Sequence, residues 1–245
     1  MPAQRFFLKG PLEVGRSSTI SQEEVHHLRV MRAKPGDEVE LVNGQGVLAQ
    51  ALLETMGSKA ATVRILRVEK EKRAPFRITL AQALPRQNRL TTILEKATEL
   101  GVDQILLFPG ELSERKDLAA VNGDRLESIL IASLKQCGRL TLPLLRIMPS
   151  LKEWKSSLVG TGAAYFGDLE PEAPWLSNLL CNSPLPKEVL FFIGPESGLS
   201  CNEIRLLREV GAQGVKLHSH ILRTDTAPIV ALGLIHHLLM AEGQR

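Results

Sequence analysis

The strongest constraint on the fold is an alternation, from residue 76 onward, of apolar runs of strand length with amphipathic runs of helical length. Ile78–Leu84 is an apolar run typical of a strand that is buried on both faces. The apolar residues from Leu90 to Leu100 keep the spacing of one helical face, and Gly101 follows as the residue that ends a helix. This alternation predicts an α/β domain in which helices cover a mostly parallel sheet.

Further apolar runs predict three more strands, at Ile105–Phe108, Val189–Ile193 and Val215–Leu217. An amphipathic run at Leu126–Leu134 predicts one more helix. Ser200 and Glu203 have the spacing of a capping box, which predicts a helix that begins there. Pro228 fits the first turn of a final helix, because its missing N–H group is not needed at that position.

The first seventy residues have a different pattern, which is typical of a small β-barrel. Asp37–Val42 and Ala61–Val68 alternate polar and apolar residues, as half-buried strands do, and Asn43-Gly44 is a hairpin turn signal. One helix is predicted over Ser21–Met31, whose first residue has capping-box spacing with Glu24.

A charged run, Glu69–Arg73, separates the two patterns and predicts a linker. We therefore expect two domains, residues 1–72 and residues 73–245. Residues 1–73 hold twelve Lys/Arg and nine Asp/Glu, whereas the remaining residues are balanced in charge. This mild basic bias is compatible with a polyanionic partner and does not require one.

Composition excludes several classes of protein. Of the 245 residues 44% are apolar and 23% charged, and polar low-complexity tracts are absent, so we expect a globular chain. The first residues lack the apolar core of a signal peptide, and the longest apolar stretch, Ile229–Ala241, is too short to span a bilayer. We therefore expect a soluble, cytoplasmic protein without membrane contact.

Cysteine and histidine spacing predicts neither a disulfide framework nor a metal site. The three cysteines, Cys137, Cys181 and Cys201, are odd in number and far apart in sequence, so reduced thiols are expected. The adjacent pairs His26-His27 and His236-His237 point to different helical faces and do not form a natural metal clamp.

Two polar segments follow predicted strands, at the end where open parallel sheets bind ligands. The first runs from Gly194 to Gly198 (GPESG), and its glycines allow positive φ and close approach of a ligand to the backbone. The second runs from His218 to Thr226 and leads into the final helix, where backbone N–H groups are free. Taken separately, an ordinary strand-to-helix turn and a helix N-cap explain them equally well. Together they predict one ligand pocket.

Common nucleotide and nucleophile motifs do not account for this pocket. Neither GxGxxG nor GxxxxGK[ST] occurs, so a dinucleotide fold of the usual kind and a P-loop are excluded. The serine of the GPESG segment is misplaced for the GxSxG nucleophile elbow.

The two segments, GPESG and Ile221–Ala227 (ILRTDTA), closely resemble those of the RsmE family, the 16S rRNA uridine-N3 methyltransferases of the SPOUT superfamily. The resemblance extends over nearly the whole chain, through Arg5-x-Phe7, Glu99–Val102, Ser113–Arg115 and Gln136–Arg139. It implies a small PUA-like β-barrel (residues 1–72, RNA-binding), a SPOUT-type α/β trefoil-knot domain (residues 73–245), S-adenosylmethionine as cofactor, and a homodimer. The implied partner is 16S rRNA, either naked or within the small ribosomal subunit.

The resemblance also implies which residues bind the cofactor. They are Ile193, Gly194, Pro195, Gly198, Leu217, His218, Ile221, Leu222 and Thr226. The sequence departs from the family at four positions: Ser197 replaces a glycine, Asp225 a glutamate, His218 a glycine and His220 an arginine.

Methylation of uridine N3 needs an oriented acceptor that has lost its imide proton. Arg223, beside the cofactor loop, is the predicted cation that stabilises the resulting anion, by the logic of an oxyanion hole. Glu196 or Asp225 is predicted to accept the proton, and the sequence does not choose between them. Six arginines are predicted by resemblance to contact RNA phosphates: Arg5, Arg29, Arg32, Arg86, Arg115 and Arg139.

Two other functions fit the same residues. A related SPOUT methyltransferase would share fold and cofactor and modify a ribose 2′-OH or another base. A non-catalytic RNA-binding assembly factor would keep the fold without the activity, and His218 and His220 are the residues that favour it.

Overall fold

The computed structural model describes residues 5–72, 74–114, 116, 122–158, 162–181 and 185–242. The chain divides into two compact units. The first comprises Met1–Arg73 together with Leu130–Leu142, and the second comprises Ala74–Ile129 together with Pro143–Arg245.

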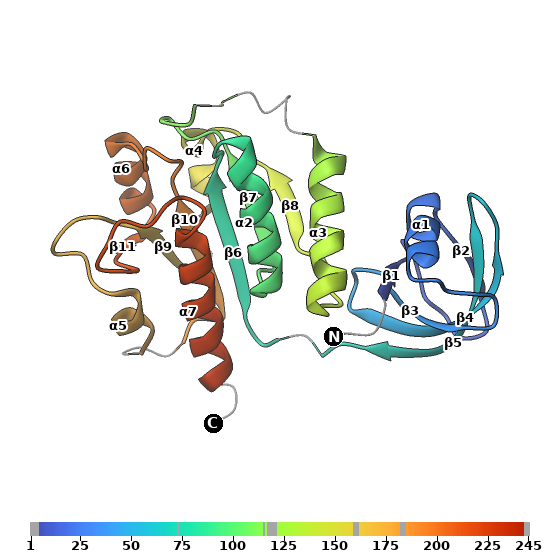
Figure 1. The fold of residues 1–245 in the computed structure, drawn as a ribbon. Helices are drawn as coiled ribbons and strands as arrows, with labels where there is room; N and C mark the ends of the chain where they lie inside the picture. Colours follow the sequence, from blue (N-terminus) through green and yellow to red (C-terminus); the bar gives the residue numbers. More distant parts are fainter. Residues whose placement is uncertain are drawn as a thin grey trace. The chain divides into compact units, whose positions relative to one another are not determined.

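The first unit is built on one curled, mixed sheet, a half-barrel of the PUA-like kind (Figure 1). Its strands lie in the order β1-β3-β4-β5-β2, and only the β1–β3 pair is parallel. Their bounds are Arg5–Phe7 (β1), Ser17–Ile20 (β2), Glu38–Val42 (β3), Val47–Met56 (β4) and Ala61–Lys70 (β5). The helix α1 covers Gln22–Val30. The predicted barrel-like, β-rich fold of this part is confirmed.

Local signals in the first unit were correct with one exception. The Asn43-Gly44 turn joins β3 to β4, and Gly44 has a φ of 72°, which a residue with a side chain rarely adopts. The predicted capping box of Ser21 and Glu24 is wrong, because the Ser21 side chain makes no capping hydrogen bond. Glu24 instead pairs with Lys135 at 2.5 Å, a residue that belongs to this unit through the segment Leu130–Leu142.

The second unit contains an all-parallel six-stranded sheet, in the order β11-β9-β10-β6-β7-β8. The strands are Arg77–Ala83 (β6), Gln104–Phe108 (β7), Leu144–Ile147 (β8), Ala163–Gly167 (β9), Glu188–Ile193 (β10) and Gln213–Val215 (β11). The helices are Gln87–Glu99 (α2), Gly123–Cys137 (α3, shared with the first unit), Leu151–Trp154 (α4), Leu176–Cys181 (α5), Cys201–Glu209 (α6) and Ala227–Glu242 (α7), and a 3-10 turn covers Lys155–Leu158. The predicted parallel α/β sheet is confirmed.

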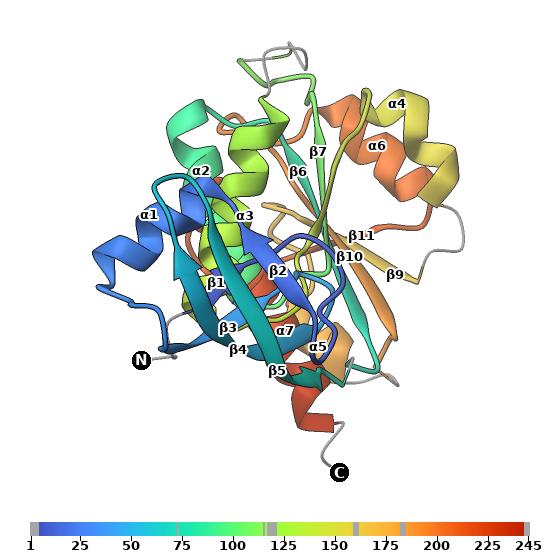
Figure 2. The same cartoon turned by 90° about the vertical axis from the view of Figure 1, so that its right-hand side faces the viewer.

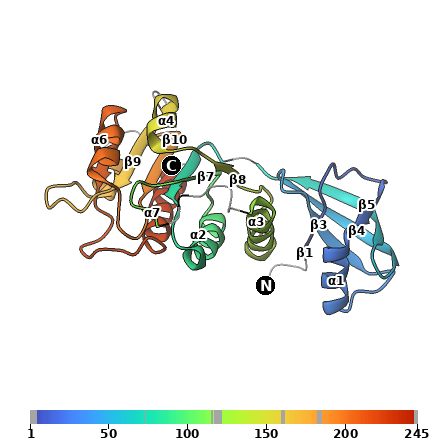
Figure 3. The ribbon, with the colours of Figure 1, turned by 90° about the horizontal axis from the view of Figure 1, so that it is seen from above.

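Helices cover both faces of this sheet, with α2 and α7 on one side and α4 and α6 on the other (Figure 3). On the second side, α4 and α6 lie next to each other (Figure 2). Successive residues of β6 face opposite sides of the sheet. Ile78 and Leu80 lie on one face, and Ala81 and Ala83 lie on the other, in the core cluster that contains Trp154. All four β6 residues are fully buried, as expected of a strand covered on both sides.

The sequence predicted the longer elements of this unit and missed short ones. Gly101 ends α2 with a φ of 88°, and Pro228 lies in the first turn of α7, as predicted. The short elements β8, β9, α4 and α5 were not predicted. The strand predicted at Val215–Leu217 is misplaced, because β11 covers Gln213–Val215 and the polar segment begins two residues earlier.

The strand order creates a switch point, which decides where a ligand can bind. The chain leaves β6 toward β7 and β8 on one side, whereas β10, β9 and β11 lie on the other side. Loops that leave the carboxyl ends of β6 and β10 therefore diverge, and open α/β sheets bind ligands in the crevice formed there. None of the helices within the described residues is long and apolar enough to cross a membrane.

Candidate active site

A cavity of about 360 Å³ lies at the carboxyl ends of β9, β10 and β11. Its wall comes from the loops that follow these three strands and from the start of α7. The lining residues are Gly167–Leu169, Ile193–Leu199, Val215, Leu217, His218, His220–Leu222, Thr224 and Ala227. The two polar segments singled out in the sequence therefore line one cavity, although about twenty residues separate them along the chain.

Two glycines give the loop after β10 its shape. A Cβ atom on Gly194 would lie 2.6 Å from the backbone of Gly198 and Leu199, so only glycine allows the loop to close on itself. Gly198 has a φ of 78° and donates its N–H to the Pro195 carbonyl at 2.9 Å. The result is a tight turn with backbone groups at the cavity wall.

The start of α6 fixes the far end of this loop. Ser200 and Glu203 form the predicted capping box, in which the Ser200 hydroxyl accepts from the Glu203 N–H at 3.0 Å. Glu203 is 1% exposed and also accepts the Glu111 N–H at 3.0 Å. Hydrogen bonds from the Ser200 hydroxyl and, second, from the Asn202 amide lower the pKa of Glu111 below its usual value.

The second loop is tied to the first by Thr224. This residue is buried, and its hydroxyl donates to the Gly194 carbonyl at 2.7 Å. Gln82, at the end of β6, donates its amide to the Thr224 hydroxyl at 3.2 Å and to the Gly194 carbonyl at 3.3 Å. Three hydrogen-bonding groups from three separate segments therefore meet beneath the cavity.

A cation joins the same two loops at a second point. Arg89, in the first turns of α2, lies 3.2 Å from Glu196 and 2.9 Å from Asp225. Glu196 also accepts the backbone N–H of Arg86 at 3.1 Å. The two carboxylates predicted as proton acceptors therefore share one guanidinium.

Most of the predicted cofactor residues line the cavity. The exception is Thr226, whose N–H donates to the Arg223 carbonyl at 2.9 Å where α7 begins. His218 and His220 lie at the cavity with ring centroids 5.3 Å apart, and the His220 N–H donates to His218 Nδ1 at 3.1 Å.

The three predicted catalytic residues occupy different positions. Glu196 lines the cavity, whereas Arg223 and Asp225 flank Thr224 outside the lining. Arg223 is exposed, with no hydrogen bond or ion pair of its guanidinium among the described residues. Asp225 is half-buried against Arg89.

Of the arginines predicted to contact RNA, Arg5, Arg86 and Arg29 bond to carboxylate or carbonyl groups of this protein. Arg5 pairs with Glu40 at 2.8 Å and donates to the Gly138 carbonyl. Arg86 forms a two-pronged pair with Glu114, and Arg29 donates to the Gly57 carbonyl at 2.7 Å.

The remaining three arginines differ in setting. Arg32 is exposed and has a φ of 59°, unusual for a residue with a side chain. Arg139 is half-buried, and Arg115 lies outside the described residues.

Three residues of the site escaped sequence analysis. Asp168 lines the cavity and pairs with Arg208 at 3.1 Å, but it follows β9, a strand too short to be recognised by pattern. Gln82 lies within the apolar run Ile78–Leu84, and Arg89 has the pattern of an ordinary exposed charge on a helix. The polar character of Gln82 inside that apolar run was the one signal that could have pointed to it.

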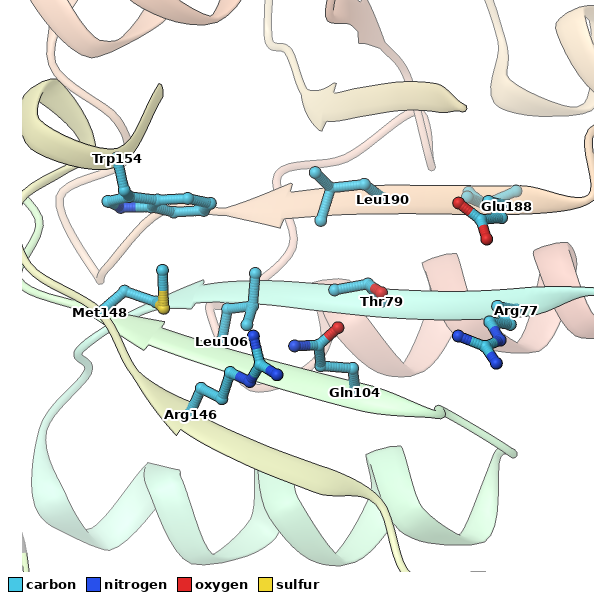
Figure 4. A pocket seen from close by; sticks show the side chains of 10 residues that line it. Arg77, Thr79, Gln104, Leu106, Arg146, Met148, Trp154, Glu188 and Leu190 are labelled. Atoms are coloured by element: carbon cyan, nitrogen blue, oxygen red, sulfur yellow. The ribbon is translucent and has the colours of Figure 1, made fainter. Parts of the chain in front are cut away.

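A second cavity, of about 310 Å³, lies over the amino-terminal halves of β6, β7 and β10 (Figure 4). Arg77, Thr79 and Glu188 project from neighbouring strands into it, on the face opposite to that of Ile78 and Leu80. No residue of the first cavity lines it, so the two cavities are separate places in the unit.

Comparisons with known proteins agree with this arrangement. The model of the RNA methyltransferase domain family matches residues 72–236, and that of the RNA methyltransferase PUA domain matches residues 20–66. The ribosomal RNA small subunit methyltransferase E of Synechocystis sp. is 31% identical over 225 residues, which cover 90% of this chain and 73% of that protein. The Bacillus subtilis protein of the same name is 26% identical over 96% of both chains.

Solved structures give the same result. The ribosomal RNA small subunit methyltransferase E of Neisseria gonorrhoeae, solved bound to S-adenosylmethionine, is 28% identical and superposes with a TM-score of 0.87. The match covers 96% of this chain and 98% of that one. The match therefore covers both units. The chain belongs to the ribosomal RNA small subunit methyltransferase E family.

Proposed function

We propose that this protein transfers the methyl group of S-adenosylmethionine to N3 of a uridine in 16S rRNA. One observation carries the proposal: the two loops that resemble the family's cofactor segments line a single cavity at the carboxyl ends of β9, β10 and β11, the edge at which open α/β sheets bind ligands. A family member of the same fold was solved with that cofactor bound. The methyl donor would be the cofactor's sulfonium, and the protein would supply position, charge and proton transfer.

The cavity fits such a cofactor in chemistry and size. Ile193, Leu217 and Leu222 offer apolar surface for an adenine ring. The turn at Gly194–Gly198 brings backbone N–H and C=O groups to the wall, where they can bond polar atoms of the cofactor. Asp168 places a carboxylate at the cavity that can accept hydrogen bonds from ribose hydroxyl groups.

The acceptor nitrogen dictates what the remaining residues must do. Uridine N3 carries an imide proton, so attack on the methyl group requires that this proton leave. The guanidinium of Arg223 is exposed and has no hydrogen bond or ion pair among the described residues, so it is free to approach the uracil oxygens and stabilise the anion. Glu196 is the better candidate for accepting the proton, because it lines the cavity, whereas Asp225 does not.

Uridine N3 lies on the base-pairing edge, so the target must be unpaired or flipped out of a helix. We propose that residues 1–72 bind RNA as a separate domain and that residues 73–245 carry the transfer. Arg32 is the strongest of the predicted phosphate contacts in the first domain, because it is exposed and free of ion pairs within the described residues. A ribosomal RNA substrate implies action in the cytoplasm.

We further propose a homodimer, on the evidence of α7. Apart from His236 and His237, the described side chains of this helix are apolar on every side, yet only one side of it is buried in the unit. Ala231, Leu232 and Ile235 form the buried side, whereas Val230 and Leu234 remain partly exposed. An all-round apolar helix is expected to be covered on every side, and a second copy of the chain would supply the cover.

Analysis of rRNA nucleosides tests the proposed acceptor. Mass spectrometry of 16S rRNA from a strain that lacks this gene should show loss of 3-methyluridine, restored by the gene in trans. Intact 3-methyluridine with loss of a 2′-O-methyl nucleoside or another base methylation would assign the related activity instead. An unchanged methylation pattern together with no binding of millimolar S-adenosylmethionine would point to the assembly factor.

A further inference from the structure

Gln82 is a polar residue at a position where the strand pattern requires an apolar one. It lies on the same face of β6 as the fully buried Ile78 and Leu80, opposite to the face on which Ala81 and Ala83 pack in the cluster of Trp154. Its side chain is itself completely buried. In the register of the sheet Gln82 is the neighbour of Ile193, the last residue before the glycine loop. The amide group is therefore buried directly below the two cofactor loops.

The hydrogen bonds around this amide have a fixed direction. The Thr224 hydroxyl donates to the Gly194 carbonyl at 2.7 Å, so its oxygen is left to accept the Gln82 amide N–H at 3.2 Å. The same amide nitrogen lies 3.3 Å from the Gly194 carbonyl and 2.9 Å from that of Ala83. These two carbonyl oxygens fix the orientation of the Gln82 amide, because a flipped amide would place its own oxygen next to them.

The arrangement is made at a cost to stability. Gln82 Oε1 is buried and has no hydrogen-bond partner among the described residues. A buried acceptor without a partner destabilises a fold, whereas a leucine of similar size would not carry this penalty. Stability therefore does not explain a glutamine here, and the tie that it forms between Gly194 and Thr224 does.

Arg89 forms an independent tie between the same loops from the direction of α2. Its guanidinium contacts Glu196, of the first loop, and Asp225, of the second. The three side chains are between 21% and 26% exposed, so this pairing is partly shielded from water and salt. The first loop thus meets the second at two places, one buried and uncharged, the other half-buried and charged.

We propose that Gln82 and Arg89 are positioning residues that hold the two loops in the arrangement that binds the cofactor. Neither residue lines the cavity, so both act through the loops and not by touching the ligand. Loops that are already held together lose less conformational freedom on binding, and this raises affinity without a new contact. The inference rests on the proposed function, because it takes S-adenosylmethionine as the ligand of the cavity.

Calorimetric titration of S-adenosylmethionine tests the buried tie. Gln82→Leu removes the hydrogen bonds and the unpartnered oxygen together, so we expect the dissociation constant to rise about tenfold while the midpoint of thermal unfolding stays the same or rises. Thr79→Val is the control: it lies in the same strand on the opposite face, at the second cavity (Figure 4), and should leave the dissociation constant unchanged.

Two variants of Arg89 test the charged tie, and they remain informative if Gln82→Leu fails to fold, since the Arg89 side chain is not fully buried. Arg89→Met should weaken cofactor binding about tenfold or more, and Arg89→Lys should restore part of it, because an ammonium can pair with one of the two carboxylates. Asn88→Ala, on the exposed side of the same turn, is the matched control.

The outcomes separate the two claims. A parent protein that fails to bind S-adenosylmethionine would overturn the proposed function and this inference with it. A parent that binds, with Gln82→Leu and Arg89→Met binding equally tightly, would overturn the positioning role alone. A loss of affinity that is matched by a loss of thermal stability in both variants would also overturn the positioning role, because it would show a general structural role.

Discussion

Single side chains set the charge around the cavity. Glu196 and Asp225 share Arg89, whereas Arg223 is exposed and does not line the cavity. We propose that Arg89 holds the loops and that Arg223 is left for the substrate. Their roles cannot be exchanged, because a guanidinium between two carboxylates has little of its charge available for a developing uracil anion.

Arg223→Ala should therefore abolish most of the turnover and leave the fold intact. Loss of one group that stabilises a developing anion costs on the order of 10²–10³ in kcat. Steady-state methyl transfer measures this, with cofactor affinity and thermal midpoint as checks that should not change. Arg205→Ala, an exposed arginine on α6 that pairs with Glu209, is the control. Near-normal turnover of the Arg223 variant would remove this residue from the mechanism.

Among single residues, the sequence predicted those whose role depends on neighbours in the chain and missed those whose partners are far away in sequence. The GPESG loop and the Thr224–Thr226 segment carry their turn and cap signals within a few residues, so their place at strand ends could be predicted. Gln82 and Arg89 act through partners more than a hundred residues away, and no local pattern encodes such contacts. Asp168 was missed because β9 itself was missed.

At the scale of elements, α6 anchors the glycine loop by its first turn. Its capping box holds Ser200, and Glu111 accepts hydrogen bonds from that serine and from Asn202. The whole loop from Gly194 onward therefore ends on a fixed point. The capping box of α6 was predicted correctly from the sequence. The same spacing at the start of α1 was misleading: the Ser21 side chain makes no capping bond, and the Glu24 side chain pairs with Lys135.

Removal of the cap should loosen this element. Ser200→Ala is expected to lower the free energy of unfolding by about 1 kcal/mol, the usual effect of losing an N-cap hydroxyl. Urea denaturation followed by circular dichroism measures the change. Ser21→Ala is the matched comparison at α1 and should cost less, because that hydroxyl makes no capping bond. Equal losses in the two variants would contradict the assignment of the cap.

Glu111 predicts a pH dependence of stability. Hydrogen bonds from Ser200 and Asn202 hold its pKa below the usual 4.5, so its charged form favours the folded state. This stabilisation is complete above about pH 4.5 and is lost as the pH falls through the lower pKa of the folded state. Glu111→Gln should therefore flatten the fall of unfolding free energy on the acid side, measured by urea titrations at several pH values. An unchanged acid slope would contradict the hydrogen-bonded pair.

For the whole molecule, the sequence pattern predicted the fold class but not the order of the strands in the sheet. Strand–helix alternation from residue 76 specified a parallel, helix-covered sheet, because buried strands and amphipathic helices have distinct periods. The order of strands was beyond reach, since β10 inserts between β9 and β6 through contacts far apart in sequence. That order creates the crevice, so the location of the cavity at a strand end was predictable and its construction from three neighbouring loops was not.

The apolar circumference of α7 leads to a prediction about assembly. Leu234→Arg should convert a dimer into a monomer that keeps its secondary structure, because it puts a charge on the partly exposed side of the helix. Sedimentation equilibrium at micromolar concentration is the measurement. Val14→Arg, an exposed apolar position in the first unit, is the control and should leave the state of association unchanged. A parent protein that sediments as a monomer would contradict the dimer.

Reconstitution with purified components tests whether this protein methylates uridine N3 of 16S rRNA. The protein is incubated with S-adenosylmethionine and small ribosomal subunits from a strain that lacks the gene, and the nucleosides of the 16S rRNA are analysed by mass spectrometry. We expect one 3-methyluridine per rRNA with the parent protein and almost none with Arg223→Ala. Methylation at a ribose or another base, or no methylation by a parent protein that binds the cofactor, would show that the proposed activity is wrong.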